Sequence, residues 1–395
     1  MRHPRTGRSL ALVLSLLAVL ALAACGTSDD RSEGATTTTA AKGAGEPIVI
    51  GVDLPLSGPS AGAAERMKKA FELLAAEINA NDGVNGSEIV LDIQDDGGDP
   101  TTGVALIDRF NQAGAVAIIG TYNTPVVLAQ SDAILAAKIP QLAFAIGSSI
   151  GEKQNPWVFQ TGPTDKGQID GLIEYFKANK ITKPAILTDT SAFGTGAKPV
   201  LEAAFAEAGI TPALNDTFAV DATDVSPVLL KAKQSGADAV VVWTVGPPYA
   251  VFATGAQQVD LGIPIFGTAS AADPNVAKLA GAAANNIFFQ NSIDPQKPAV
   301  VEVSNAWADE FDGTVPAEAF SAHDILTIIV DGLKKVGNDR EALRDYLDTY
   351  TSTSLLAGRQ GGTFEFTPTN HVGLGGGNTV WNKYVNGEFT VITVK

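Results

Sequence analysis

The chain is poor in the residues that metal, redox and histidine chemistry require. It has 395 residues but only one cysteine, Cys25, and three histidines. One thiol cannot form an internal disulfide, a cysteine-rich zinc site or a Cys-x-x-Cys redox pair. Cationic side chains are also scarce, since 27 Lys and Arg face 43 Asp and Glu, which gives a formal charge of −16. We therefore expect no metal, no cofactor and no nucleic-acid partner.

The length and composition predict two folded domains, or one unusually large one. At about 100 to 200 residues per domain, 395 residues exceed what one core normally accommodates. A hydrophobic fraction of 45% against 18% charged residues is enough to bury cores over most of the chain.

The first 45 residues are predicted to direct export of the protein and to anchor it to a membrane. Three arginines and no acid precede the apolar run 10–24, which is shorter than the roughly 20 residues needed to span hydrocarbon. The run ends in Leu-Ala-Ala-Cys at Cys25, which resembles a bacterial lipobox. We expect a signal peptide at 1–24, a lipid on Cys25 and a flexible tether at 25–45, with an uncleaved anchor helix as the alternative. The protein would then be exported and held at the outer face of the bacterial cell membrane, in the periplasm or the cell-wall space.

From residue 46 onward, short buried strands alternate with amphipathic helices. The run Ile-Val-Ile-Gly-Val at 48–52 is typical of a strand covered on both faces, and residues 61–79 carry apolar side chains at helical spacing. Asp99 and Pro100 are suited to cap and begin the next helix, and His323-Asp324 is interpreted as the capped start of a later one.

The same pattern continues in two series that are separated by Gly162-Pro163. Alternating strands and helices predict a doubly wound parallel sheet for each series. The Asn386-Gly387 turn predicts a terminal hairpin. Further expected strands are 89–94, 116–119, 141–146, 185–187, 217–220, 239–245, 263–266, 287–290, 378–386 and 388–394, and further expected helices are 126–137, 197–208, 226–234, 248–259, 300–311, 323–335 and 340–349.

Several motifs follow one another in the order found in one receptor family. They are Gly-Val-Asp-Leu-Pro-Leu-Ser-Gly-Pro at 51–59, Glu-Ile-Asn at 77–79, Asp-Asp-Gly-Gly-Asp-Pro at 95–100, Ile-Ile-Gly at 118–120 and Ser-Ala-Phe-Gly at 191–194. In this order they resemble the leucine/isoleucine/valine-binding protein family, the extracytoplasmic solute receptors of ABC importers. The resemblance implies an α/β fold of the type I periplasmic-binding (Venus-flytrap) kind, with two doubly wound parallel-sheet lobes.

The resemblance also implies three crossovers, meaning the chain segments that join the two lobes. By position they fall near 161–165, 291–295 and 367–376. Lobe 1 is then expected to comprise 46–163 plus 294–370, and lobe 2 to comprise 164–293 plus 371–395. The ligand would lie in the cleft between the lobes, which would close by hinge bending.

Candidate ligand contacts follow the strands, because ligands of open α/β sheets bind outside the carboxyl ends of the strands. In lobe 1 these ends present Tyr122, Asn123 and Thr124, and then Gly147 and Ser148. The resemblance implies that Thr124, at the start of a helix, holds a ligand carboxylate, and that Ser148, or Gly147 through its backbone, is the second clamp. Helix capping is the alternative for Thr124 and Ser148, and plain packing is the alternative for Tyr122.

In lobe 2 the corresponding ends present Phe193, Trp243, Thr244 and Ala269. Trp243 either lines the cleft or packs inside the sheet. The family's amino-acid receptors carry an acid at the position of Ala269, where it neutralises the ligand ammonium. An α-amino acid ligand therefore requires another acid here, such as Asp273, because a buried ammonium without an anion costs several kcal/mol.

A second departure from the family enlarges the expected site. Ala63 stands where family members place an apolar aromatic side chain, so a bulkier ligand would fit. We expect a monomeric receptor that binds a small amino-acid-like, carboxylate or amide ligand, delivers it to the permease of an ABC importer and catalyses no reaction. The exact ligand is left open.

Two other functions are considered. A sensory receptor on the same fold would pass its signal to a protein partner. A serine hydrolase is suggested by Gly147-Ser148-Ser149-Ile150-Gly151, which fits Gly-x-Ser-x-Gly. The hydrolase is disfavoured because the available bases, His323 and His371, lie far along the chain.

Overall fold

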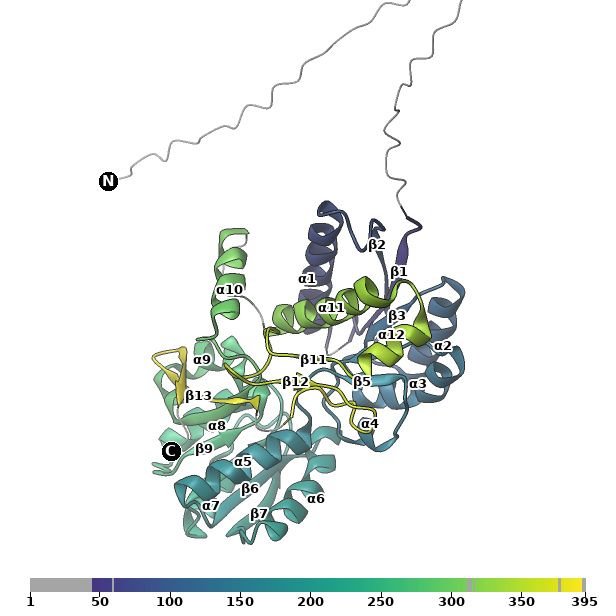
Figure 1. Ribbon diagram of the computed structural model, residues 1–395. Helices are drawn as coiled ribbons and strands as arrows, with labels where there is room; N and C mark the ends of the chain where they lie inside the picture. Colours follow the sequence, from purple (N-terminus) through teal and green to yellow (C-terminus); the bar gives the residue numbers. More distant parts are fainter. Residues whose placement is uncertain (1–44, 59, 311–314, 316, 376–377, 393–395) are drawn as a thin grey trace, which may run out of the picture. The chain divides into compact units, whose positions relative to one another are not determined.

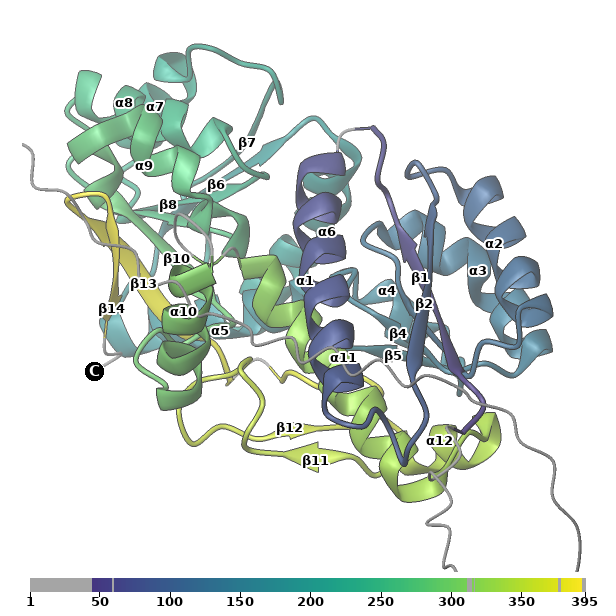
Figure 2. The same cartoon turned by 90° about the horizontal axis from the view of Figure 1, so that it is seen from above.

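Two main sheets organise the computed structural model, which describes residues 45–58, 60–310, 315, 317–375 and 378–392 (Figures 1 and 2). The predicted signal peptide, Cys25 and nearly all of the tether lie outside these ranges. The first sheet has the order β2-β1-β3-β4-β5, and all of its strand pairs are parallel. Its strands are β1 (Ile48–Leu54), β2 (Ile89–Asp95), β3 (Ala117–Gly120), β4 (Gln141–Ala143) and β5 (Val158–Gln160).

The second sheet has the order β14-β13-β10-β9-β8-β6-β7. It is parallel except where β10 pairs with β13 and β13 with β14. Its strands are β6 (Pro184–Asp189), β7 (Leu214–Phe218), β8 (Ala239–Trp243), β9 (Ile265–Gly267), β10 (Ile287–Asn291), β13 (Val380–Val385) and β14 (Glu388–Ile392). A short ribbon pairs β11 (Thr351–Ser352) with β12 (Phe364–Glu365). The two largely parallel sheets confirm the predicted α/β class, and β13 and β14 form the predicted terminal hairpin.

Helices connect the strands within each sheet. Among the described helices, none combines the length and the apolar character needed to cross a membrane. The α-helices are α1 (Ala61–Ala80), α2 (Pro100–Gln112), α3 (Thr124–Ala137), α4 (Ser149–Glu152), α5 (Asp165–Asn179), α6 (Ala192–Glu207), α7 (Ser226–Gln234), α8 (Pro248–Gln258), α9 (Pro274–Ala280), α10 (Pro298–Glu310), α11 (Ala317–Val336) and α12 (Arg340–Leu347), and the 3-10 helices are η1 (Ala269–Ala272) and η2 (Gly281–Asn286).

Local sequence explains several helix starts. The Asp99 side chain accepts a hydrogen bond from Thr102 N at 2.8 Å, with Pro100 in the first turn, as expected from the sequence. Thr164 caps α5 in the same way, because its hydroxyl accepts from Gly167 N at 3.0 Å. Such caps satisfy amide groups that the first turn leaves without partners.

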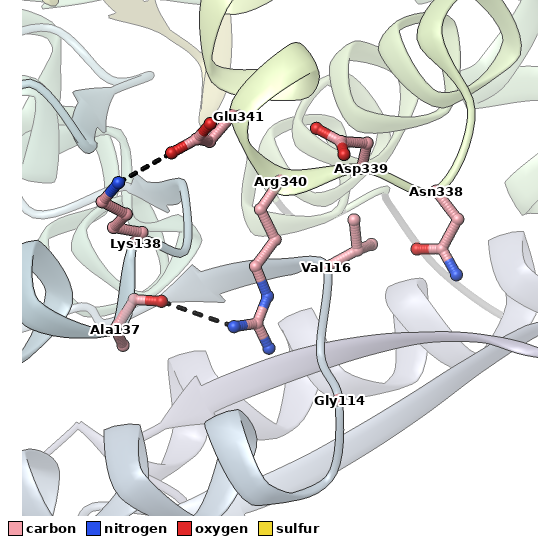
Figure 3. A pocket seen from close by; sticks show the side chains of 8 residues that line it. All are labelled: Gly114, Val116, Ala137, Lys138, Asn338, Asp339, Arg340 and Glu341. Atoms are coloured by element: carbon pink, nitrogen blue, oxygen red, sulfur yellow. Dashed lines mark hydrogen bonds and ion pairs between the residues drawn. The ribbon is translucent and has the colours of Figure 1, made fainter.

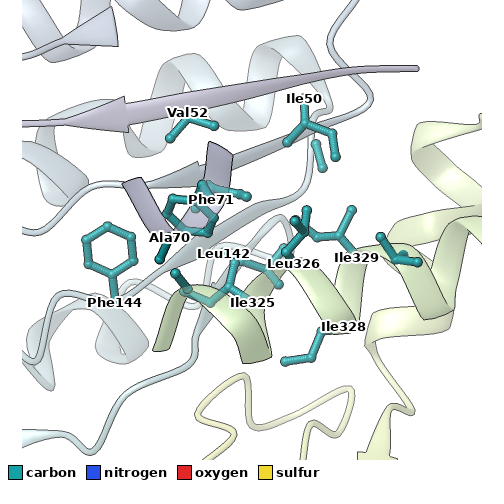
Figure 4. Packing of buried hydrophobic residues seen from close by; sticks show 14 of the residues in the cluster. Ile50, Val52, Ala70, Phe71, Leu142, Phe144, Ile325, Leu326, Ile328 and Ile329 are labelled. Atoms are coloured by element: carbon teal, nitrogen blue, oxygen red, sulfur yellow. The ribbon is translucent and has the colours of Figure 1, made fainter. Parts of the chain in front are cut away.

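Helix α11, from late in the chain, completes the hydrophobic core on one face of the first sheet. The apolar face of α11 packs against α1, and both helices share this core with β1. Figure 4 shows Ile50, Phe71 and Leu326, one from each element, within the same cluster. Each of the three side chains is at most 1% exposed. Segments more than 250 residues apart in sequence therefore share one hydrophobic core.

Two expected helix starts are wrong. The helix predicted at 323–335 begins at Ala317, so His323 and Asp324 lie inside α11 and do not cap it. The Asp324 carboxylate instead accepts hydrogen bonds from the backbone N–H groups of Leu356 and Ala357 at 2.8 and 2.6 Å. The helix predicted at 197–208 begins at Ala192, because Ser191 supplies the cap.

We predict that Leu326→Ala lowers the free energy of unfolding by about 2–5 kcal/mol, because it leaves a cavity among buried apolar side chains. Urea denaturation measures the change. The control is Leu135→Ala on α3, whose side chain is 48% exposed and should change stability by no more than about 0.5 kcal/mol. Equal effects of the two substitutions would show that α11 is not part of the core.

Candidate ligand-binding site

Two loops meet at the carboxyl edge of the first sheet. Strands β3 and β4 are neighbours; the loop after β3 leads to Thr124, the first residue of α3, and the loop after β4 carries Gly147. Gly147 N donates to Thr124 Oγ1 at 3.1 Å. A Cβ atom on Gly147 would lie 2.4 Å from Thr124 Cγ2, so only glycine allows this approach. The structure thus brings together the two predicted loops, and the Thr124 hydroxyl keeps its own hydrogen for another acceptor.

An acid that was not predicted from the sequence stands beside Ser148. Asp165, the first residue of α5, accepts a hydrogen bond from Ser148 N at 3.0 Å through its side chain. Its backbone N–H donates to Ile146 O at 2.9 Å. Asp165 ends the predicted first crossover, 161–165, which is the signal that could have singled it out. The site therefore contains a carboxylate at the position of the expected second clamp.

The Gln160 side chain also binds the loop at 145–148. It is 1% exposed, and its side-chain amide donates to Ala145 O and Gly147 O at 3.0 Å each. Four consecutive residues, 145–148, thus have backbone groups bonded to Gln160, Thr124 and Asp165. The loop is held by side chains rather than by a strand partner.

Tyr122 lies at the edge of the site next to an ion pair. Its ring is 40% exposed and lies 5.9 Å from the Phe144 ring. Arg66 on α1 binds Glu318 on α11 through two hydrogen bonds, at 2.5 and 3.2 Å. Partial desolvation raises the pKa of Tyr122, and the charge of Glu318 raises it further. These two charged residues were not expected from the sequence.

The remaining first-sheet candidates, Asn123 and Ala63, are partly buried. Asn123 stands at the N-cap position of α3 without a capping side-chain hydrogen bond, and its Oδ1 is 3.5 Å from Ser60 Oγ. Ala63 lies in the first turn of α1, about one helical turn before Arg66. Arg66 therefore lies on the same face of α1 as Ala63.

At the second sheet, the Thr244 side chain makes its hydrogen bond inside the protein. It is fully buried, and its hydroxyl donates to Asp189 Oδ2 at 2.6 Å. The other oxygen of Asp189 accepts from Ser191 N at 2.9 Å and from the Ser191 hydroxyl. These bonds satisfy a carboxylate that is 1% exposed at the end of β6.

Trp243 is a core residue, which was the alternative to lining a cleft. It is 2% exposed and packs in the hydrophobic cluster under α5 and α6. Phe193, in the first turn of α6, is partly buried and stacks over it, with ring centres 6.1 Å apart and planes inclined by 18°. Phe193 therefore covers Trp243.

The position of Ala269 is neutral and tightly held. Ala269 N donates to Gln168 Oε1 at 2.8 Å. Asp273 is the acid expected to replace the missing one at Ala269. Its carboxylate instead caps α9, where it accepts a hydrogen bond from Asn275 N at 2.8 Å. Behind this loop the Tyr249 hydroxyl accepts from Thr268 N at 2.8 Å, and burial raises the pKa of Tyr249 to about 12.

Two further buried acids, Asp53 and Asp96, lie close to each other at the first sheet. Asp53 in β1 is fully buried and accepts from Gln130 Nε2 at 2.5 Å. Asp96, 1% exposed, accepts from the Thr121 hydroxyl and from Gly98 N. Burial, and then the charge of Asp96, hold the pKa of Asp53 well above its ordinary value. The Asp53 carboxyl therefore keeps its proton to a higher pH than an exposed aspartate does.

A large hollow lies elsewhere on the described part of the chain. It has a volume of about 550 Å³ and is open and polar, next to Val116, which precedes β3, and so at the amino edge of the sheet (Figure 3). Arg340 bridges its walls by donating to Ala115 O and Asn111 Oδ1 at 2.8 Å each, and Lys138 pairs with Glu341 at 2.7 Å. Within the described ranges, no three His, Cys, Asp or Glu side chains are placed to share a metal ion.

Comparison with known proteins agrees with the fold. The model of the periplasmic binding protein family matches residues 47–375. The chain is similar to Leu/Ile/Val-binding protein homolog 3 of Brucella melitensis, with 26% identity over 74% of this chain and 80% of the relative. It is also similar to the Leu/Ile/Val-binding protein BraC3 of Rhizobium johnstonii, with 25% identity over 75% of this chain and 81% of the relative.

Solved structures share the architecture at low sequence identity. The branched-chain amino acid transporter substrate binding protein LivJ of Streptococcus pneumoniae, in complex with isoleucine, matches with a TM-score of 0.71 and 19% identity over 88% of this chain and 99% of that one. An ABC transporter substrate-binding protein from Desulfitobacterium hafniense, in complex with Leu, matches with a TM-score of 0.73 and 20% identity over 88% of this chain and all of that one. The predicted type I periplasmic-binding fold is confirmed.

We predict that Thr244→Val lowers the free energy of unfolding by about 1–3 kcal/mol, because it leaves one oxygen of the buried Asp189 carboxylate without its donor. Thr244→Ser keeps the hydroxyl and should retain most of the stability. Thermal or urea unfolding of both variants measures the difference. If valine were tolerated as well as serine, the Thr244–Asp189 bond would not contribute.

We predict that Asp53→Asn gains stability relative to the natural protein as pH rises. A carboxyl whose folded pKa is raised contributes most at low pH, and it destabilises the fold increasingly once pH exceeds its unfolded pKa near 4. Urea unfolding from pH 4.5 to 8 should therefore show a widening difference. Asp108→Asn, an exposed acid on α2, is the control and should show no such trend. A constant Asp53→Asn difference would mean that Asp53 is ionised throughout.

Proposed function

Because the chain belongs to the periplasmic binding protein family and to its leucine/isoleucine/valine-binding branch, we propose that it is the extracytoplasmic solute-binding receptor of an ABC importer. Its ligand is a neutral α-amino acid or a close analogue with an apolar side chain, held between lobes 1 and 2 and passed to a membrane permease. The predicted lipid on Cys25 keeps the receptor at the membrane. The lobe boundaries predicted from the sequence are part of this proposal.

The arrangement of Thr124, Ser148 and Asp165 carries the proposal. An α-amino acid presents a carboxylate and an ammonium group a few ångströms apart. The Thr124 hydroxyl hydrogen and the start of α3 favour the carboxylate. Asp165, bonded to Ser148 N at 3.0 Å, supplies the anion for the ammonium. It takes the role that the family assigns to the position of Ala269, and so the absence of an acid there no longer argues against an amino acid.

Apolar side chains near the strand ends support a hydrophobic ligand side chain. Tyr122 is 40% exposed and lies next to Thr124, and Val245, two residues after β8, is 53% exposed. Phe193 is partly buried at the start of α6. BraC3 is named a Leu/Ile/Val-binding protein, and the two solved structures named above contain isoleucine and leucine, which agrees with this chemistry. The small Ala63 leaves room for larger side chains.

We predict that L-leucine or L-phenylalanine raises the melting temperature, whereas leucinamide, which lacks the carboxylate, and 4-methylpentanoate, which lacks the ammonium, do so much less. A ligand at 100 times its Kd stabilises the folded state by about 2.7 kcal/mol, which a thermal shift detects readily. Stabilisation by 4-methylpentanoate as large as by leucine would remove the ammonium site from the proposal.

Variants assign the two groups separately. Thr124→Ala should weaken binding of the best amino acid at least a few-fold, and Thr124→Ser should retain it. Asp165→Asn preserves an acceptor for Ser148 N but removes the charge, so it should weaken amino-acid binding at least ten-fold and leave 4-methylpentanoate binding unchanged. The control is Glu174→Gln, an exposed acid on α5. Calorimetric titration gives the affinities, and an unchanged affinity in Asp165→Asn would rule out its role.

A further inference from the structure

The side chain of His371 lies between β5 and the residue that follows α12. Its ring is 13% exposed and stacks on Phe159, with centres 4.1 Å apart and planes inclined by 17°. His371 Nδ1 lies 3.1 Å from Val158 O, and Nε2 lies 3.0 Å from Asp348 Oδ1. The second contact is an ion-pair distance without the alignment of a strict hydrogen bond.

Both partners of the ring can only accept hydrogen bonds. A backbone carbonyl and a carboxylate have no hydrogen to offer, whereas a neutral imidazole has one N–H and one bare nitrogen. One bare nitrogen would therefore face an oxygen at about 3 Å. The charged imidazolium suits both contacts, because it donates a hydrogen bond from Nδ1 to Val158 O and attracts the Asp348 carboxylate at the ion-pair distance of 3.0 Å.

The charged groups around His371 are linked by a series of ion pairs. Asp348 also accepts from Arg344 Nη1 at 2.8 Å, and Arg344 binds Asp345 at 2.8 Å. The Arg344 guanidinium lies 5.4 Å from the centre of the Trp157 ring. These charges all come from α12 and its end, while β5 and the residue before it, 157–160, contain no charged or titratable side chain. Asp348 thus contacts Arg344 through one carboxylate oxygen and His371 through the other.

The backbone of His371 is connected to the candidate ligand-binding loop. Gln160 N donates to His371 O at 2.8 Å, and Gly373 N donates to Gln160 O at 2.9 Å. Gln160, which directly precedes the predicted first crossover, is thereby paired with Val372 in the predicted third crossover. The Gln160 side chain in turn holds Ala145 O and Gly147 O. A continuous set of bonds leads from His371 to Gly147.

We propose that His371 is a pH-sensitive contact, whose imidazolium form holds the predicted third crossover against β5 and the residue that follows α12, and whose deprotonation loosens this pairing and the ligand-binding loop. The proposal rests on the two-lobe arrangement of the proposed function. Imidazole groups change charge between about pH 5 and 8. A contact that needs the protonated form is present at the low end of this range and is lost as pH rises.

Hydrogen–deuterium exchange of the ligand-free protein at pH 5.5 and 8.5 tests this pH-sensitive contact. After correction for intrinsic rates, protection of the Gln160 and Gly373 amides should fall at least three-fold at the higher pH. His371→Gln should abolish this pH dependence, and His371→Lys, which stays charged, should keep protection constant. His323→Gln changes the histidine that contacts Asp324 on α11 and should behave like the natural protein.

Two results would overturn the pH-sensitive contact. One is an unaltered pH dependence of the two amides in His371→Gln. The other is a His371 ring that stays neutral from pH 5.5 to 8.5 by NMR titration of its Cε1 proton. Because no ligand is present, either result leaves the proposed function untouched, and a failure to bind amino acids would leave the exchange data interpretable.

Discussion

The loop at 145–148 is the constraint on which the site depends. Parallel strands end together at one edge of a sheet, and the loops that follow them cannot pair with one another as strands do. Their backbone groups must find partners other than a neighbouring strand. Here Thr124 accepts from Gly147 N, Asp165 from Ser148 N, and Gln160 donates to two carbonyl groups. The side chains that satisfy the loop are also those proposed to face a ligand or to connect to a predicted crossover.

Several residues of the site therefore have two roles. Asp165 is held in place by Ser148 N and Ile146 O before any ligand arrives. A carboxylate that is already oriented loses little freedom when an ammonium group binds, which favours affinity. Gln160 likewise orients Gly147 and pairs with the segment at His371. A few hydrogen bonds thus connect the proposed ligand-binding loop with the segment predicted to form the third crossover.

Much of the fold could be predicted because it depends on local patterns. Buried β-branched runs marked β1 and β8, Asp99-Pro100 marked the start of α2, and Asn386-Gly387 marked the terminal hairpin. The start of α11 was misplaced because His323-Asp324 looks like a cap, whereas Asp324 instead binds the backbone of a segment more than thirty residues later.

The candidate site was only partly predictable, for the same reason. Strand ends located Thr124 and Gly147, which do meet. Asp165, Gln160 and the Arg66–Glu318 pair were missed, because their roles arise from contacts between distant segments that no local spacing reports. Trp243 illustrates the converse, since its position at a strand end permitted either a cleft or a core location, and the covering Phe193 ring places it in the core.

The most direct measurement is a crystal structure of the protein with the amino acid that gives the largest thermal shift. We expect the ligand carboxylate to lie within hydrogen-bond distance of Thr124 Oγ1 and the ammonium group within the same distance of the Asp165 carboxylate. A ligand bound instead in the hollow beside Arg340, or one that contacts neither Thr124 nor Asp165, would contradict the proposed receptor site.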